Sequence, residues 1–323
     1  MKIKTLTIFQ FFFLLIFSYL GIISFGLWQQ VIDLRGAEIS SIPFLQPHFL
    51  RYLLVLPIFL LSNLLSIEAD LIFNLVAIIL ILAIVGNVSR IAILLLPAEV
   101  KKKYQINIFI FILMIMVAVF MNGRILFSMA GLSLILLSIL KWENSYSSGL
   151  KLFISLIFGV FLCSVSSGTF LSSIAIIATW AILLRQKKSK FILISLLIFI
   201  LSVSPLLSVY LMKNIDFYGG GFEGFLNMLN HGMGSIFFYA GNESSIFIIT
   251  FLLILSLFCL MALSYLRRYR LILSCILISI MGGFFGYSTM MQGLPILISM
   301  FAILLFGGIE NLSLKKAKII ETQ

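Results

Sequence analysis

Long uncharged apolar runs fill most of the sequence, and they decide what the chain can fold into. Only 10% of its 323 residues are charged and 62% are hydrophobic, whereas soluble chains carry roughly 25% charged residues. A soluble globular protein is excluded, because no compact shape could hide this much apolar surface from water. Backbone groups in lipid must satisfy their own hydrogen bonds, which leaves helices for runs of this length. The sequence therefore predicts an all-α polytopic integral membrane protein, with residues 1–323 as a single transmembrane domain.

Charged residues divide the apolar sequence into candidate membrane spans. A spanning helix needs about 20 mostly apolar residues, and several runs are short, so we expect about 10–12 transmembrane helices. The first run follows Lys2 and Lys4 as a signal peptide would, but no small-residue cleavage site follows it, so we expect a retained helix. The candidate runs are residues 8–28, 52–67, 71–96, 106–120, 125–140, 152–165, 170–184, 191–211, 246–265, 271–287 and 295–309.

Clusters of Lys and Arg predict the side of the membrane on which each loop lies, because such clusters stay cytoplasmic. Even numbers of candidate spans separate these clusters, so one orientation satisfies all of them. That orientation places Arg124, residues 166–168 and the long polar segment 212–245 on the outer side. The clusters lie at residues 101–103, 185–190, 267–270 and 315–318.

The N-terminal region does not fit a simple count of spans. Two full spans within residues 52–96 would place Lys2 and Lys4 outside, although basic residues near spans are expected on the cytoplasmic side. The opposite orientation needs this stretch to cross the membrane a net odd number of times, with one half re-entrant or lying in the interface. Pro57 is consistent with such an imperfect crossing. We favour a cytoplasmic N-terminus, which puts the polar loop 29–51 on the face that already carries the long polar segment.

The outer segment 212–245 combines polar side chains with aromatic rings. A sugar ring has an apolar face and hydroxyl edges, so this combination is typical of glycan-binding surfaces. Residues 222–233 are predicted to form a short amphipathic helix in the membrane interface. His231 lies within it, and an unperturbed pKa of about 6.5 suits a general base. The alternative is a solvated interfacial histidine without a catalytic role.

The sequence Asn122, Gly123, Arg124 interrupts two apolar runs at the predicted outer side. The planar guanidinium of Arg124 is suited to clamp the phosphates of a lipid-linked substrate. Alternatively, this arginine snorkels from the rim of the helix bundle to lipid headgroups. A lysine would replace a snorkelling arginine but not a two-pronged clamp.

Motifs of soluble enzymes are absent from the sequence. It has no Walker loop, HExxH or GxSxG motif, and the GGGFEG stretch at 219–224 matches GxGxxG only formally, because it opens no βαβ helix. Cys163, Cys259 and Cys275 lie inside apolar runs without metal-ligand spacing. The excess of Lys and Arg lacks the basic polar face of a nucleic-acid-binding protein. We therefore expect no metal, no cofactor and no nucleic-acid partner.

The sequence resembles the polytopic polysaccharide polymerases of bacterial capsule and O-antigen clusters, the Wzy-type and EpsG-like families. The resemblance rests on the chain length with its many spans, the NGR of residues 122–124 opening a span, the SSGTF of residues 166–170, and one long outer loop between late spans. It is architectural and covers most of the chain.

This resemblance implies a glycosyltransferase that polymerises undecaprenyl-diphosphate-linked oligosaccharide repeat units at the periplasmic face of the bacterial inner membrane, without nucleotide sugar or metal. Residues 212–245 are then a long periplasmic loop. Similar transferases use an outer-loop histidine as base and arginines on the diphosphate, which implies His231 and Arg124 as catalytic residues. The implied partners are the lipid-linked glycan, membrane lipids, a chain-length regulator and a flippase. The candidate substrate-binding residues are Arg35, Arg51, Lys213 and Glu223.

Two other functions stay open at the level of sequence. A secondary transporter or flippase is expected to carry charges in the bundle interior, and apart from Arg90 the spans contain essentially none. A glycosyltransferase that uses a polyprenyl-phosphate sugar as donor would place its base in the first loop, where Asp33 and Glu38 stand.

Overall fold

Helices make up all of the regular structure in the part of the chain that is described. The computed structural model describes residues 3–32, 47–96, 102–119, 121–144, 146, 148–183, 208, 212, 215–216, 218–225, 227, 269–285 and 287–307. No strand occurs within these ranges. The predicted all-α class is thereby confirmed.

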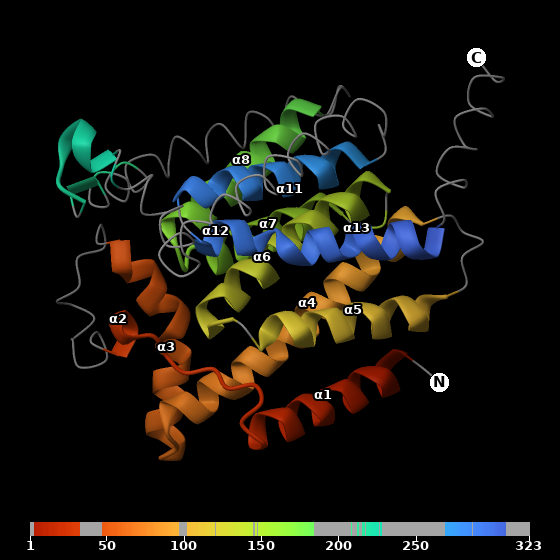
Figure 1. Ribbon diagram of the computed structural model, residues 1–323, viewed down its shortest axis with the longest axis horizontal. Helices are drawn as coiled ribbons and strands as arrows, with labels where there is room; N and C mark the ends of the chain where they lie inside the picture. The colour runs from red at the N-terminus through yellow and green to blue at the C-terminus, as the bar shows by residue number, and fades with distance from the viewer. Residues whose placement is uncertain are drawn as a thin grey trace, which may run out of the picture.

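Most of the helices coincide with predicted apolar runs (Figure 1). The runs 191–211 and 246–265 lie outside the described residues, apart from Ser208. The elements are α1 (Ile3–Tyr19), α2 (Gln29–Ile32), α3 (Pro47–Leu65), α4 (Ala69–Leu95), α5 (Lys103–Ala118), α6 (Gly123–Glu143), α7 (Gly149–Cys163), α8 (Ser167–Leu183), α11 (Arg270–Met281), the 3-10 helix η3 (Gly282–Phe285), α12 (Tyr287–Gln292) and α13 (Leu294–Gly307).

Three helical stretches among the described residues are long and apolar enough to cross a membrane. They are Ala69–Leu95, Gly123–Glu143 and Thr289–Gly307. The other apolar helices are shorter. α5, for example, has 16 residues, or roughly 24 Å at about 1.5 Å per residue, against a hydrocarbon core about 30 Å thick. The total of about 10–12 spans therefore stays a prediction.

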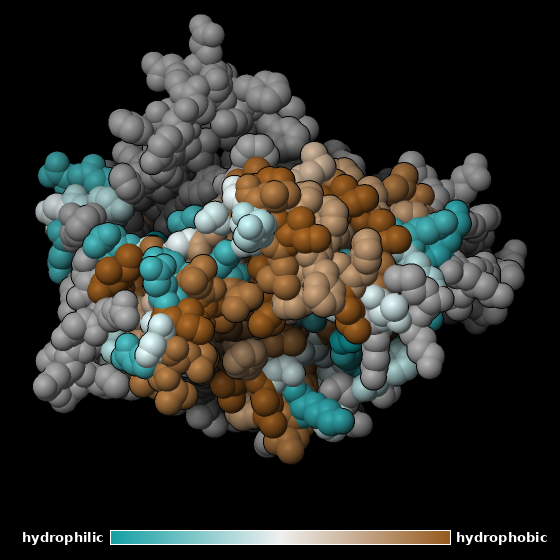
Figure 2. Space-filling view, turned by 90° about the horizontal axis from the view of Figure 1, so that it is seen from below, coloured by the Kyte–Doolittle hydropathy of each residue, from teal (hydrophilic) through white to brown (hydrophobic). Residues whose placement is uncertain are grey.

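The outward faces of α1, α4 and α5 are apolar along their length. A spacing of four residues keeps side chains on one face of a helix, and large exposed hydrophobic side chains recur at this spacing. Figure 2 shows the resulting hydrophobic surface on one face of the molecule. Such a continuous apolar surface suits contact with lipid. The residues that form it include Ile8, Phe12 and Ile16 on α1, Leu71, Leu75 and Ile79 on α4, and Ile108, Ile112 and Met116 on α5.

One end of the bundle, which we call the basic end, gathers most of the described lysines and arginines. α4 ends and α5 begins there, and α6 ends and α7 begins there (Figure 1). The Tyr269 hydroxyl donates to the Leu95 carbonyl at 3.5 Å, which holds the start of α11 at this end as well. The basic end carries Arg90, Lys102, Lys103, Lys141, Lys151 and Arg270.

The opposite end, which we call the Arg124 end, carries the start of α6 and the whole of α3 (Figure 1). α1 runs antiparallel to α4. Near the basic end, Gln10 Nε2 of α1 donates to Asn107 Oδ1 of α5 at 2.7 Å. Toward the Arg124 end, Asn74 Nδ2 of α4 donates to Ser18 Oγ of α1. α3 is steeply inclined to these helices and lies across the Arg124 end. Within residues 47–95, α4 runs along the bundle, whereas α3 lies at one end of it (Figure 1).

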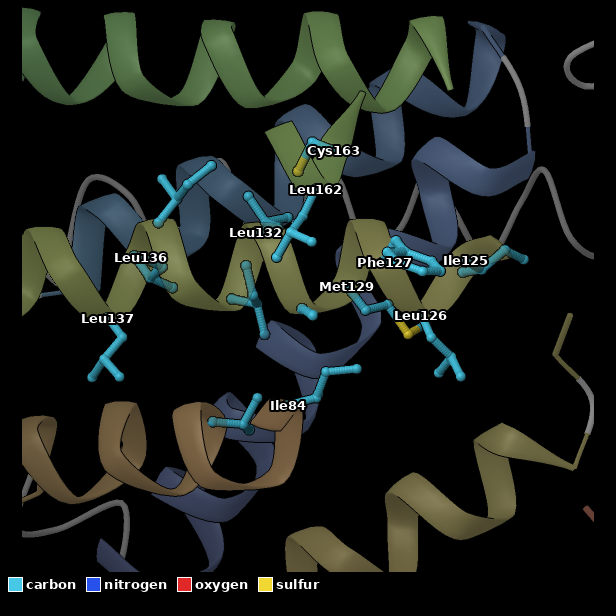
Figure 3. Packing of buried hydrophobic residues seen from close by; sticks show 14 of the residues in the cluster. Ile84, Ile125, Leu126, Phe127, Met129, Leu132, Leu136, Leu137, Leu162 and Cys163 are labelled. Carbon is cyan, nitrogen blue, oxygen red and sulfur yellow. The ribbon is translucent and has the colours of Figure 1, made fainter. Parts of the chain in front are cut away.

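α6 is the central helix, buried on nearly all sides (Figure 3). It packs against α7 at two glycines. A Cβ atom on Gly131 would lie 2.5 Å from the carbonyl oxygen of Gly159 and 2.8 Å from Cys163 Sγ. Small residues let membrane helices approach closely in this way. The contact fixes the position of α6 and of the residues at its start.

Two apolar runs fold differently from their simple prediction as unbroken helices. In the run 8–28, α1 ends at Tyr19 and the chain turns at Gly21, whose φ of +71° is a conformation that favours glycine. The following segment then packs Phe25 into the core. In the run 271–287, α11 ends at Met281 and gives way to η3.

Candidate functional site

Arg124 lies in the first turn of α6, half-buried. Asn122 is the N-cap, and its Oδ1 accepts a 2.8 Å hydrogen bond from the Arg124 backbone N–H. Asparagine is preferred here because its side chain satisfies a backbone donor that has no partner in the helix. Gly123 is needed for packing, since a Cβ there would collide with the Phe73 ring and lie 3.2 Å from Phe25 Cβ. The NGR sequence is thus a cap, a close-contact glycine and an arginine at the helix start.

A wall of aromatic rings lies beside this helix start. The rings of Trp28 and Phe73 meet edge to face with centroids 6.0 Å apart, and Phe73 and Phe127 follow at 6.2 Å. The Leu27 backbone N–H donates to Asp70 Oδ1 at 2.8 Å, which ties the segment after α1 to the start of α4. The start of α6 is therefore bordered on one flank by aromatic side chains.

α3 brings a second predicted site residue to the same end. Arg51 is 7% exposed and lies in the second turn of α3, which packs against α4 and α7. A guanidinium keeps its charge in proteins, and the start of a helix favours negative charge nearby. Arg51 and Arg124 together make the Arg124 end suited to an anionic group.

The described part of the polar outer segment lies toward the same end (Figure 1). Glu223 is exposed in a short helical turn that follows Gly219, Gly220 and Gly221, all with positive φ. The turn is held by a 3.2 Å hydrogen bond from Asn227 Nδ2 to the Tyr218 carbonyl. Burial raises the pKa of the Tyr218 hydroxyl. Three predicted site residues lie outside the described residues, namely Arg35, Lys213 and His231.

A group of buried polar side chains that sequence reasoning missed lies where α8, α11 and α12 meet. Gln292 Nε2 donates to Ser172 Oγ, and Thr289 packs directly on Gly282. Gly282 and Gly283 lie at this place, and the absence of a side chain at Gly282 permits the close approach of Thr289. We call the following four residues the polar cluster: Ser172, Ser279, Thr289 and Gln292.

At the basic end, the contacts are structural. Trp180 Nε1 donates to Glu143 Oε1 at 2.9 Å, and the rings of Trp142 and Trp180 meet edge to face at 5.7 Å. These contacts join the end of α6 to α8. Arg90 is exposed nearby, so it does not supply a charge inside the bundle.

Comparison of the chain with protein-family models, with curated proteins and with solved structures finds no match in any of the three.

Proposed function

We propose that the chain is a glycosyltransferase that polymerises undecaprenyl-diphosphate-linked oligosaccharide repeat units of a capsule or O-antigen at the periplasmic face of the bacterial inner membrane. The observation that carries the proposal is the presence of Arg51 and Arg124 near helix starts at one end of an apolar bundle. Two guanidinium groups there suit the diphosphate of a substrate whose lipid tail lies in the bilayer.

The distribution of charge supports an outer location for the Arg124 end. Six described lysines and arginines lie at the basic end, and basic residues near span ends mark the cytoplasmic side. Glu68 and Asp70 stand at the start of α4, at the Arg124 end. With the basic end cytoplasmic, the antiparallel course of α1 puts the start of α1, which includes Lys4, on the cytoplasmic side as well.

The local structure around Arg124 favours the clamp over a snorkelling side chain. The Asn122 cap and the Gly123 packing contact fix the backbone on both sides of the helix start. Arg124 is itself half-buried rather than extended along the surface. The fixed backbone gives the arginine a defined starting point, and its planar guanidinium can bind two oxygens of a phosphate.

In the proposed reaction, His231 removes the proton from an acceptor hydroxyl, whose oxygen forms a bond to the anomeric carbon of the donor glycan. The bond from that carbon to the lipid diphosphate breaks, and the electron pair leaves with the diphosphate. Arg124 and Arg51 stabilise the developing negative charge, which is often the largest catalytic term. The role of His231 rests on the sequence and completes the proposal. The substrate supplies the leaving group, so few ionisable residues are needed.

The proposal is tested by deleting the gene and resolving the surface glycan by gel electrophoresis. We expect single repeat units at the surface and no long chains, with long chains restored by the intact gene. A flippase would instead leave lipid-linked repeat units on the cytoplasmic side and none at the surface. An unchanged ladder of chain lengths after deletion would rule the polymerase out.

A further inference from the structure

Three oxygen atoms of the polar cluster have no hydrogen-bond partner in the structure as far as it is described: Ser279 Oγ, Thr289 Oγ1 and Gln292 Oε1. Their residues are 1%, 0% and 0% exposed. Buried side-chain polar atoms are satisfied in the large majority of cases, so several orphaned oxygens at one place call for an ordered water or an ion as their partner.

Several other buried hydroxyl groups in the described bundle donate to the carbonyl group three residues earlier in their own helix. Ser279 and Thr289 form no such bond. Their oxygens are therefore available to something else. The satisfied examples are Ser128 to Ile125 at 2.9 Å, Ser173 to Phe170 at 2.7 Å and Ser299 to Ile296 at 2.6 Å.

The three orphaned oxygens belong to residues that lie around the break between α11 and α12. A Cβ atom on Gly293 would lie 2.8 Å from Ser279 Oγ. Ser279 therefore lies beside Gly293, the residue directly after Gln292. Gly282 lies three residues after Ser279, at the C-cap of α11, and a Cβ atom on Gly282 would collide with the Thr289 methyl group. Gln292 is in turn fixed by its Nε2, which donates to Ser172 of α8.

The chemistry of the cluster selects a monovalent cation. Its orphaned atoms are two hydroxyl oxygens and one amide oxygen, and oxygen ligands suit hard cations. Divalent Ca²⁺ and Mg²⁺ are bound with the help of carboxylates, which the polar cluster lacks. Ser279 lies in the last turn of α11, where the helix dipole is negative and favours a cation. In transporters, Na⁺ is coordinated at breaks in membrane helices by unwound backbone carbonyls and half-helix C-terminal ends, and the polar cluster lies at a helix break as well.

We propose that the polar cluster binds a sodium ion through Ser279 Oγ, Thr289 Oγ1 and Gln292 Oε1. The ion satisfies all three buried oxygens and links α11 to α12, and Gln292 extends the link to α8. The site is separate from Arg124 and does not depend on the proposed polymerisation. Its expected role is to stabilise the interrupted helices.

The test uses the full-length chain purified in detergent, with thermal unfolding followed in equal concentrations of NaCl, KCl and choline chloride. We expect the melting temperature to rise by a few degrees in NaCl only, because a ligand that binds the folded state stabilises it. Equal melting temperatures in the three salts would overturn the proposal and indicate water in the cluster. Equal stabilisation by Na⁺ and K⁺ would also overturn it.

Variants assign the effect to the site. Ser279→Ala and Thr289→Val should weaken the binding of radioactive sodium by at least about tenfold and remove the sodium-dependent rise in melting temperature. Ser299→Ala is the matched control, since it removes a buried hydroxyl that is satisfied within α13, and it should retain both properties. Sodium binding that is unchanged in both Ser279→Ala and Thr289→Val would refute the site. The comparison of salts on the unmodified chain decides the question even where a variant fails to fold.

Discussion

Arg124 is the residue whose geometry bears most directly on the proposed reaction. Replacing it by lysine keeps the charge but loses the two-pronged donor geometry. A charged hydrogen bond is worth about 1.5–3 kcal/mol, so Arg124→Lys should lower polymerisation by roughly 10–100-fold. The length of surface glycan measures this in the deletion strain carrying the variant. Arg90→Lys, at the exposed basic end, is the control and should leave glycan length unchanged. Full-length glycan in Arg124→Lys would instead identify a snorkelling side chain.

His231 is the residue on which the proposed proton transfer depends. His231→Ala should give normally expressed, membrane-inserted protein whose polymerisation falls by about 10²–10⁴-fold, the usual contribution of a general base. Asp33→Asn and Glu38→Gln should have smaller effects, as judged by the same glycan gels. The reverse ranking, with Asp33→Asn abolishing long chains and His231→Ala harmless, would move the catalytic base to the first loop.

The sequence predicts some of these residues better than others, for physical reasons. Arg124 stands out because a charge between two apolar runs is costly unless it has a role. The reason for Gly123 is visible only in three dimensions, where the Phe73 ring occupies the place of a Cβ. The polar cluster could not be predicted, because a serine or threonine in an apolar helix usually bonds to its own backbone, and nothing in the sequence marks the exceptions.

At the scale of elements, the crossing of α6 and α7 is the contact most sensitive to added volume. A Cβ atom on Gly131 would lie 2.5 Å from the Gly159 carbonyl oxygen, so Gly131→Ala must separate the two backbones. We expect a loss of about 1–3 kcal/mol of stability, typical of overpacking, measured as a lower melting temperature in detergent.

The control for this variant is Gly86→Ala on α4, where a Cβ atom would meet nothing within 4 Å. Alanine in a helix interior is favoured over glycine by roughly 0.5–1 kcal/mol, so this variant should melt at the same temperature or slightly higher. Equal melting of Gly131→Ala and the unmodified chain would show that α6 and α7 are not in backbone contact.

Apolar periodicity predicts where helices form but not always where they end. Residues 20–28 are as apolar as α1, yet the chain leaves the helix at Gly21 and is held by the Leu27 to Asp70 hydrogen bond. The break of α11 at Gly282 likewise follows from tertiary packing on Thr289. α3 forms at its predicted place, but its inclined course across the Arg124 end is set by contacts that hydropathy does not report.

For the whole molecule, the charge difference between the two ends predicts the orientation in the membrane. Reporter fusions after residues 188 and 268 and at the C-terminus should report cytoplasm, because the basic clusters lie there. Fusions within 212–245 should report periplasm, and so should a fusion in the loop 29–51. A cytoplasmic signal from the segment 212–245 would place His231 and Arg124 on the wrong side for the proposed reaction.

The most direct measurement is polymerisation by the purified chain in liposomes that contain undecaprenyl-diphosphate-linked repeat units as the sole glycan. The proposed function predicts a ladder of lipid-linked glycans that lengthens with time, with neither nucleotide sugar nor metal added, and a strongly reduced ladder with Arg124→Lys. Repeat units that remain single with the folded, inserted chain, or a ladder that Arg124→Lys leaves intact, would contradict it.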